Sequence, residues 1–153
     1  MKCTITSDGS EKHILAKNYS SVKKKTKELI ARLSEKGYNE FYINCEYGIP
    51  LIAGEIICEL KTNHSIKLHI VVPYEEQCSS WSKKARDKYY LIHQASDTVT
   101  FAEKRYTEEC YKAADVIMAD NSDYVAVFAE KNYVPYIAEY SKVRNILCEL
   151  IEI

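Results

Sequence analysis

The spacing of apolar residues changes along the chain, and each change marks a boundary between expected elements. Residues 22–33 carry apolar side chains at helical spacing, whereas residues 68–72 form a continuous apolar run, typical of a strand buried on both faces. Strands are predicted in residues 2–6, 40–45, 67–72, 97–101, 124–128 and 144–153. Helices are predicted in residues 20–37, 50–63, 79–95, 107–119 and 135–141.

Strands that alternate with helices at this spacing indicate a parallel sheet with right-handed crossovers. We therefore expect an α/β fold, a single Rossmann-like doubly wound domain over residues 1–153. Its mostly parallel sheet has five or six strands, with helices on both faces. Ligands of such sheets bind beyond the carboxyl ends of the strands. The expected crevice is lined by residues 6–7, 46–48, 73–77, 102–105 and 129–133.

Composition narrows the function classes. A formal net charge of −1 argues against nucleic acid as a partner. No apolar run approaches the roughly 20 residues needed to span a membrane. The six cysteines show no Cys-x-x-Cys spacing and the four histidines are dispersed, which indicates reduced thiols in a cytoplasmic protein and no metal site. With only four glycines, no phosphate-cradling loop and no cofactor are expected.

Two carboxylates follow the second predicted strand. Glu46 lies in the turn after that strand and Glu55 lies on the next helix, so the two are candidates for general acid and base. The alternative is a solvated loop acid and a helix-surface acid. Tyr47 and Gly48 lie in the same turn and are candidate ligand contacts.

A second group of candidates surrounds the loop after the third predicted strand. Pro73 ends this strand, and Gln77 lies in the loop where a ligand would bind. Tyr74 and Trp81 could stack on a base or ring, although Trp81 could equally anchor its helix on the sheet. Arg105 follows the fourth predicted strand and is the best-placed cation for the crevice.

Three sequence elements occur in an order found in a known family. They are Pro73-Tyr-Glu-Glu-Gln77 followed by Trp81, Met118-Ala-Asp-Asn-Ser-Asp123 leading into Val125-Ala-Val127, and Gly48 with Ala53 and Glu55. This set resembles the YpsA branch of the SLOG superfamily, Rossmann-like proteins related to the Lonely Guy phosphoribohydrolases and the DprA proteins. The resemblance implies the fold already predicted and a nucleotide-derived ligand at the carboxyl ends of the strands.

Other elements of that family are missing. Asn44 and Cys45 replace the family's paired glycines, and Pro50 replaces its aspartate. Thr6-Ser-Asp-Gly stands where the family has Thr-Gly-x-Arg, and Ala114-Asp115 where it has Arg-Asn. Glu130-Lys-Asn-Tyr133 stands in place of its Gly-Gly-Thr. Glycine lets backbone N–H groups approach a phosphate, and arginine grips it with two hydrogen bonds. Losing both weakens any inheritance of nucleotide binding or N-glycosidic hydrolysis, and so argues against an enzyme.

The sequence leaves three hypotheses for function. The first is a SLOG-like protein that binds a nucleotide-derived or other small ligand without turnover. The second is a phosphoribohydrolase-like N-glycosidase acting on nucleotides through Glu55 or Glu46. The third is a non-catalytic interaction domain with a degenerate site, acting as a homodimer through a surface rich in tyrosine, of which the chain has thirteen.

Overall fold

The computed structural model describes residues 1–153 and contains one sheet with the strand order β4-β3-β2-β1-β5-β6. The strands are β1 (Lys2–Ser7), β2 (Glu40–Ile43), β3 (Lys67–Val72), β4 (Thr98–Phe101), β5 (Tyr124–Ala129) and β6 (Leu147–Glu152). The helices are the 3-10 helix η1 (Ser10–His13), α1 (Leu15–Glu35), α2 (Ile49–Lys61), α3 (Lys83–Ala95), α4 (Cys110–Asp120) and α5 (Tyr136–Val143). All neighbouring strands are parallel, which confirms the predicted Rossmann-like, doubly wound α/β fold.

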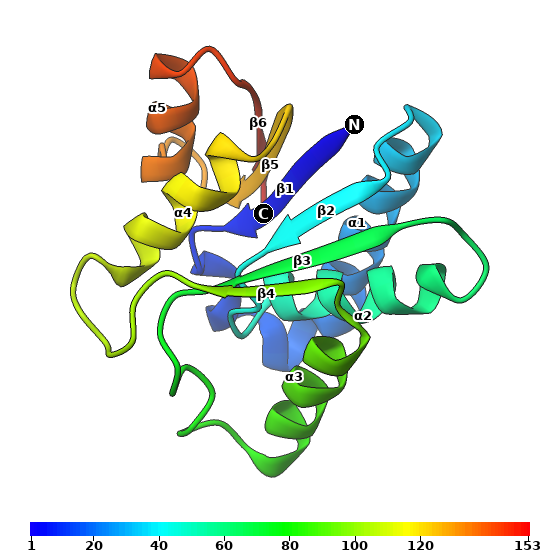
Figure 1. The fold of residues 1–153 in the computed structure, drawn as a ribbon, viewed down its shortest axis with the longest axis vertical. Helices are drawn as coiled ribbons and strands as arrows, with labels where there is room; N and C mark the ends of the chain where they lie inside the picture. Colours follow the sequence, from blue (N-terminus) through cyan, green and yellow to red (C-terminus); the bar gives the residue numbers. More distant parts are fainter.

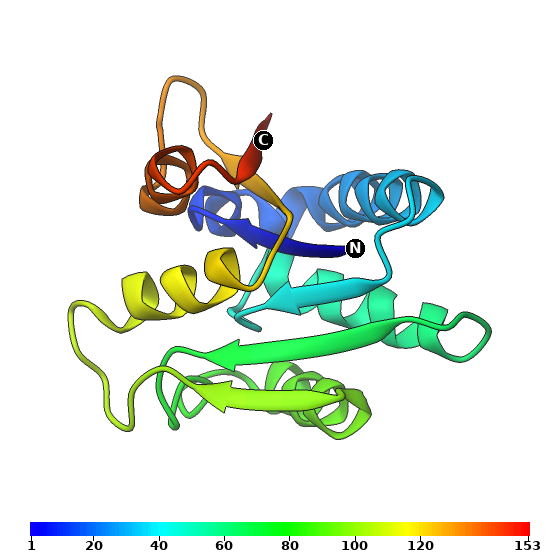
Figure 2. The same ribbon diagram turned by 45° about the horizontal axis from the view of Figure 1, so that its top comes forward.

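Helices α1, α2 and α3 cover one face of the sheet, and α4 and α5 cover part of the other (Figure 1). Figure 2 shows the same layers from a second direction. The core under α1–α3 contains 24 buried residues and the core under α4 and α5 only eight, because α4 and α5 leave part of that face of the sheet uncovered. On that open part, His69 hydrogen-bonds to Glu40 (3.0 Å) and Thr98 (2.7 Å) across three strands.

The order in which strands are added to the sheet reverses between β1 and β5. From β1 to β4 each crossover adds a strand on the same side. The β4–α4–β5 connection then returns across the sheet to place β5 on the other side of β1 (Figure 1). The loops after β1 and β5 therefore lead to opposite faces and separate at the carboxyl edge. In doubly wound sheets, this topological switch point is where ligands bind.

Several helices begin at residues other than those expected. Helix α1 begins at Leu15 rather than near Ser20, and it continues through a kink at Asn18 (φ −123°). Helix α3 begins after Ser82, whose hydroxyl accepts a hydrogen bond from the Ala85 N–H, so Trp81 precedes the helix. Helix α4 begins at Cys110 because the chain forms a turn before it.

A buried carboxyl group fixes the turn after β1. Glu11 is fully buried, and its Oε1 accepts hydrogen bonds from the Ser7 hydroxyl (2.7 Å) and from the N–H of Ile49 (3.0 Å), the first residue of α2. That N–H has no partner within the helix. Gly48 has φ +114°, and a Cβ at this position would overlap Glu11 Oε1. Glu11 therefore ties the β1 loop to the start of α2, and Gly48 makes the close approach possible.

None of the helices combines the length and apolar character needed to cross a membrane. All six cysteines are free thiols; Cys3, Cys45, Cys78 and Cys110 are buried, and the other two are half-buried.

Gly48→Ala tests the tie between Glu11 and α2. The new Cβ would force the carboxyl group away from Ile49 in addition to straining the backbone. We expect the free energy of unfolding in urea to fall by about 2–4 kcal/mol. The control is Gly37→Ala, which has a similar φ of +95° but an open approach, with its nearest neighbouring atom 3.5 Å away. Its strain alone should lower the free energy by about 1 kcal/mol. Equal losses in the two variants would contradict the proposed tie.

Candidate functional site

A crevice of about 350 Å³ opens at the switch point between β1 and β5. Strand β1 and its loop contribute Ser7, Asp8, Gly9 and Lys12, and the loop after β2 contributes Asn44 and Glu46. Helix α4 contributes Tyr111 and Asp115, and the segment entering α5 contributes Tyr133, Pro135, Tyr136 and Ile137. The lining combines three carboxylic acids with hydroxyl groups and one lysine. We call it the switch-point crevice.

Glu46 lies at the centre of a small polar network. Its Oε2 accepts a hydrogen bond from the Tyr111 hydroxyl and lies 3.8 Å from Lys12 Nζ, and its Oε1 accepts one from the backbone N–H of Tyr47 (2.7 Å). Burial raises the pKa of Tyr111, and the neighbouring Glu46 raises it further. Tyr111 therefore stays neutral and keeps its proton on the bond to Glu46.

Asp115 is the second acid placed to act in the crevice. It lies one helical turn after Tyr111 on α4, so both side chains project from the same face of that helix. Burial raises the pKa of Asp115 to about 7, and no cation or hydrogen-bond donor offsets that burial. A carboxyl group with this pKa can donate or accept a proton near neutral pH.

Asp8 joins the two loops that form the walls of the switch-point crevice. Its Oδ1 accepts hydrogen bonds from the backbone N–H and the hydroxyl of Ser10, at 2.8 and 2.6 Å. Its Oδ2 accepts one from the N–H of Glu130 (3.0 Å) in the loop after β5. Asp8 therefore has a structural role in positioning the crevice walls.

The structure does not bring Glu46 and Glu55 together. Glu55 lies on α2, where its side chain is 3.4 Å from Lys88 Nζ and 3.4 Å from the Tyr19 hydroxyl. It lines a separate cavity between the helices, together with Tyr47 and Gly48. The predicted turn residues are thus divided, with Glu46 facing the switch-point crevice and the next two residues facing the other cavity.

Trp81 and Gln77 both pack against neighbouring elements. The Trp81 ring meets Tyr47 and Tyr89 edge-on, with centroid distances of 5.7 and 5.4 Å. Gln77 is buried, donating to the carbonyl oxygen of Asn44 (3.1 Å) and accepting from the Tyr89 hydroxyl (3.1 Å). These contacts position the loop after β3 against the loop after β2.

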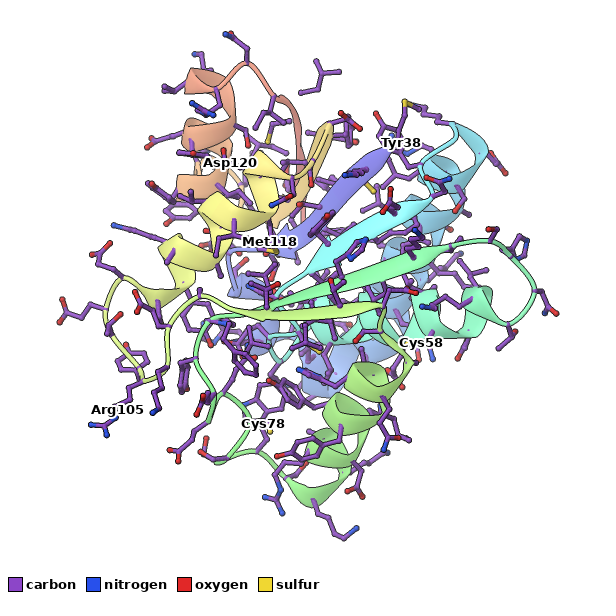
Figure 3. The ribbon with its side chains drawn as sticks, viewed as in Figure 1. Tyr38, Cys58, Cys78, Arg105, Met118 and Asp120 are labelled. Carbon is purple, nitrogen blue, oxygen red and sulfur yellow. The ribbon has the colours of Figure 1, made fainter.

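The remaining predicted contacts lie around the crevice or away from it. Pro73 is buried at the end of β3, where its carbonyl accepts the N–H of Glu103 (3.1 Å). Tyr74 is half-buried with its ring 6.4 Å from that of Tyr111, beside the crevice wall. Arg105 is exposed on the loop between β4 and α4 and points away from the sheet into solvent (Figure 3).

Tyr111 and Asp115 are crevice residues that sequence reasoning did not select. With Ala114 and Met118 they follow the i, i+3, i+4, i+7 spacing of the buried face of a helix. The sequence signal that could have identified Asp115 is an acid on the buried face of a predicted helix. No group of three or more histidine, cysteine, aspartate or glutamate side chains is arranged to hold a metal ion.

An all-parallel sheet with a polar crevice at its strand-order reversal defines a Rossmann-like α/β protein. The chain belongs to the YpsA family of SLOG proteins, because the model of that family, described as the YspA SLOG family, matches residues 14–144. The sequence resemblance to the YpsA branch is thereby confirmed.

The chain is similar to proteins named UPF0398 in several bacteria. It is 36% identical to one from Halalkalibacterium halodurans over 85 residues, which is 55% of this chain and 45% of the relative. It is 31% identical to one from Listeria monocytogenes serotype 4b over 104 residues, 67% of this chain and 58% of the relative. It is 28% identical to one from Bacillus thuringiensis over 130 residues, which is 81% of this chain and 71% of the relative. The chain thus spans about half the length of the first two relatives.

Asp115→Asn tests the raised pKa of this half-buried acid. In the unfolded chain Asp115 loses its proton near the ordinary value of 3.8, whereas the folded protein retains it until about pH 7. The folded state therefore binds more protons in this window, so its free energy of unfolding falls as pH rises and levels off above the window. The neutral amide removes this penalty. We expect the variant to be more stable than the wild type by about 2 kcal/mol at about pH 8, measured by urea unfolding.

At the acidic end of the window, the stabilities of the wild type and Asp115→Asn should converge. Glu108→Gln is the charge-matched control, because Glu108 is exposed just before α4. A pH profile of Asp115→Asn parallel to that of the wild type would contradict the raised pKa.

Proposed function

We propose that this protein binds a small nucleotide-derived ligand in the switch-point crevice, and that it recognises mainly the sugar or nucleoside portion. The observation that carries the proposal is the acidic, hydroxyl-rich lining, with Asp8, Glu46 and Asp115 opposed by Lys12 alone. Carboxylates accept hydrogen bonds from sugar hydroxyls and from base N–H groups but repel phosphate. Asn44 and three tyrosines add further donors and acceptors.

The sequence departures from the YpsA family support the same ligand class. Asn44 occupies a position where the family resemblance leads us to expect glycine, and Asp115 lies where the family has the second residue of its Arg-Asn pair. The first change adds a side chain where a phosphate would need close backbone contact, and the second adds an acid. Both changes favour a ligand with few or no phosphates. The six free thiols support a cytoplasmic location.

A thermal-shift panel tests this proposal with adenosine, adenosine monophosphate, ADP-ribose and inorganic phosphate. Adenosine should raise the melting temperature more than its monophosphate does, and phosphate alone should have no effect. Asp115→Asn and Glu46→Gln should each abolish the adenosine shift. Glu55→Gln should retain it, because Glu55 lines the other cavity. A stronger response to phosphate-bearing ligands, or a loss of the shift in Glu55→Gln, would contradict the proposed site.

We infer a second candidate, an N-glycosidase, from the different surroundings of the two crevice acids. Asp115, with a pKa of about 7, could protonate the leaving base, while Glu46 stabilises the positive charge that develops on the sugar and orients a water molecule. The hydroxyl of the water bonds to the anomeric carbon as the carbon–nitrogen bond breaks, and the proton that the water loses restores Asp115, giving free base and free sugar.

Chromatography of nucleosides and nucleoside monophosphates incubated with the protein separates turnover from binding. Release of free base that is lost in Asp115→Asn would establish the hydrolase. Ligand-dependent stabilisation without any release of base would support binding without catalysis. In either case Glu55→Gln should behave like the wild type.

A third proposal, a non-catalytic interaction domain acting as a homodimer, is supported by exposed apolar side chains on the edge strand β6 and at the end of α5. Val143, Leu147 and Leu150 are 80%, 68% and 49% exposed, and β6 has no strand on its outer side. Exposed edge strands of this kind favour pairing with another chain. Light scattering that gives a monomer mass at high concentration would contradict this proposal.

A further inference from the structure

A second cavity, of about 260 Å³, lies between α1, α2 and the first turn of α3. It shares no lining residue with the switch-point crevice. The turn after β2 separates the two, because Glu46 faces the crevice while Tyr47 and Gly48 face this second space. We call it the helical cavity. Nothing proposed above for the crevice uses it.

The floor of the helical cavity is apolar. Leu15 comes from α1, Leu51 and Ile52 from α2, and Ala85 from α3, and each is less than a tenth exposed. A ligand that covers this floor removes apolar surface from water, which is the main source of affinity in small-molecule pockets. The volume lies just below the usual range for drug-sized ligands and suits a single ring with a short substituent.

Aromatic rings and positive charge surround this floor. Tyr19 and Tyr47 line the cavity, and each is about two-fifths exposed at its mouth. Lys88 lies 3.4 Å from Glu55 and holds its ammonium group 5.5 Å from the centre of the Tyr19 ring. Lys84, one turn earlier on α3, also lines the cavity and forms no ion pair. Two lysines against one glutamate leave one positive charge without a partner.

We propose that the helical cavity binds a small aromatic carboxylate. Its ring covers the leucine and isoleucine floor between the two tyrosines, and its carboxylate accepts hydrogen bonds from Lys84, with Lys88 close by. A cationic ligand fits less well, because Glu55 already has Lys88 and the Tyr19 hydroxyl as partners. One negative charge on the ligand neutralises the lining.

Phenylacetate is the probe for this site, and phenylacetamide is its uncharged match in shape. Trp81, the only tryptophan, contacts Tyr47 at the mouth and reports binding through its fluorescence. Calorimetry provides the affinities independently. We expect phenylacetate to bind at least about tenfold more tightly than phenylacetamide, since the charged contact is worth roughly one factor of ten or more.

Lys84→Met tests the position of the carboxylate. This substitution keeps the side-chain length and leaves the pair between Lys88 and Glu55 in place, so the fold should be unaffected. We expect phenylacetate affinity to fall about tenfold. The matched control is Lys83→Met, which removes the same charge one residue earlier on α3, where Lys83 pairs with Asp87 outside the cavity. Its affinity should equal that of the wild type.

Three results would overturn the proposal. Phenylacetate and phenylacetamide could bind equally, Lys84→Met and Lys83→Met could have the same affinity, or phenylacetate could fail to bind at millimolar concentration. Asp115→Asn provides a separate check, because it changes only the switch-point crevice. Loss of phenylacetate binding in Asp115→Asn would place the probe in the crevice and also overturn the helical cavity as its site.

Discussion

The buried carboxyl group of Glu11 is the constraint on which the carboxyl edge of the sheet depends. It accepts hydrogen bonds from Ser7 at the end of β1 and from the first N–H of α2, and so joins two neighbouring strand-to-helix connections. The N–H that it accepts from is one that has no partner within the helix. Its second oxygen is buried without a hydrogen-bond partner, which makes the position sensitive to any change in the turn.

This arrangement also bears on the proposal that the crevice binds a ligand poor in phosphate. The N-terminus of a helix at the carboxyl edge normally offers free N–H groups to an anion. Here the protein's own carboxyl group occupies the start of α2, and Gly48 is the residue that permits its close approach. With Asp8 held by Ser10 and Glu130, the loops around the crevice are fixed by internal acids. The acids that remain open to a ligand are Glu46 and Asp115.

The parallel α/β sheet could be predicted from the sequence, whereas its strand order and most of the site could not. The continuous apolar run of β3 and the alternation of strands with helices are local patterns, and they predicted the parallel sheet correctly. Asp115 was missed because its importance depends on the β4–α4–β5 crossover, which carries α4 over the sheet to face the loop after β2. Glu46 and Glu55 were paired because they are close in sequence, but the turn at Gly48 directs them into different cavities.

The acids that line the two cavities differ in whether the folded protein offers them a partner. In the helical cavity, Glu55 has a lysine and a tyrosine hydroxyl as partners, so its burial is offset within the folded protein. In the switch-point crevice, Asp115 has no such partner, and burial alone raises its pKa to about 7. Its ionised carboxylate therefore destabilises the free protein at neutral pH. A ligand that donates a hydrogen bond to this carboxylate would offset that cost. The unpaired acid therefore supports the switch-point crevice as the proposed ligand site more strongly than the aromatic contacts around Trp81 would support a site there.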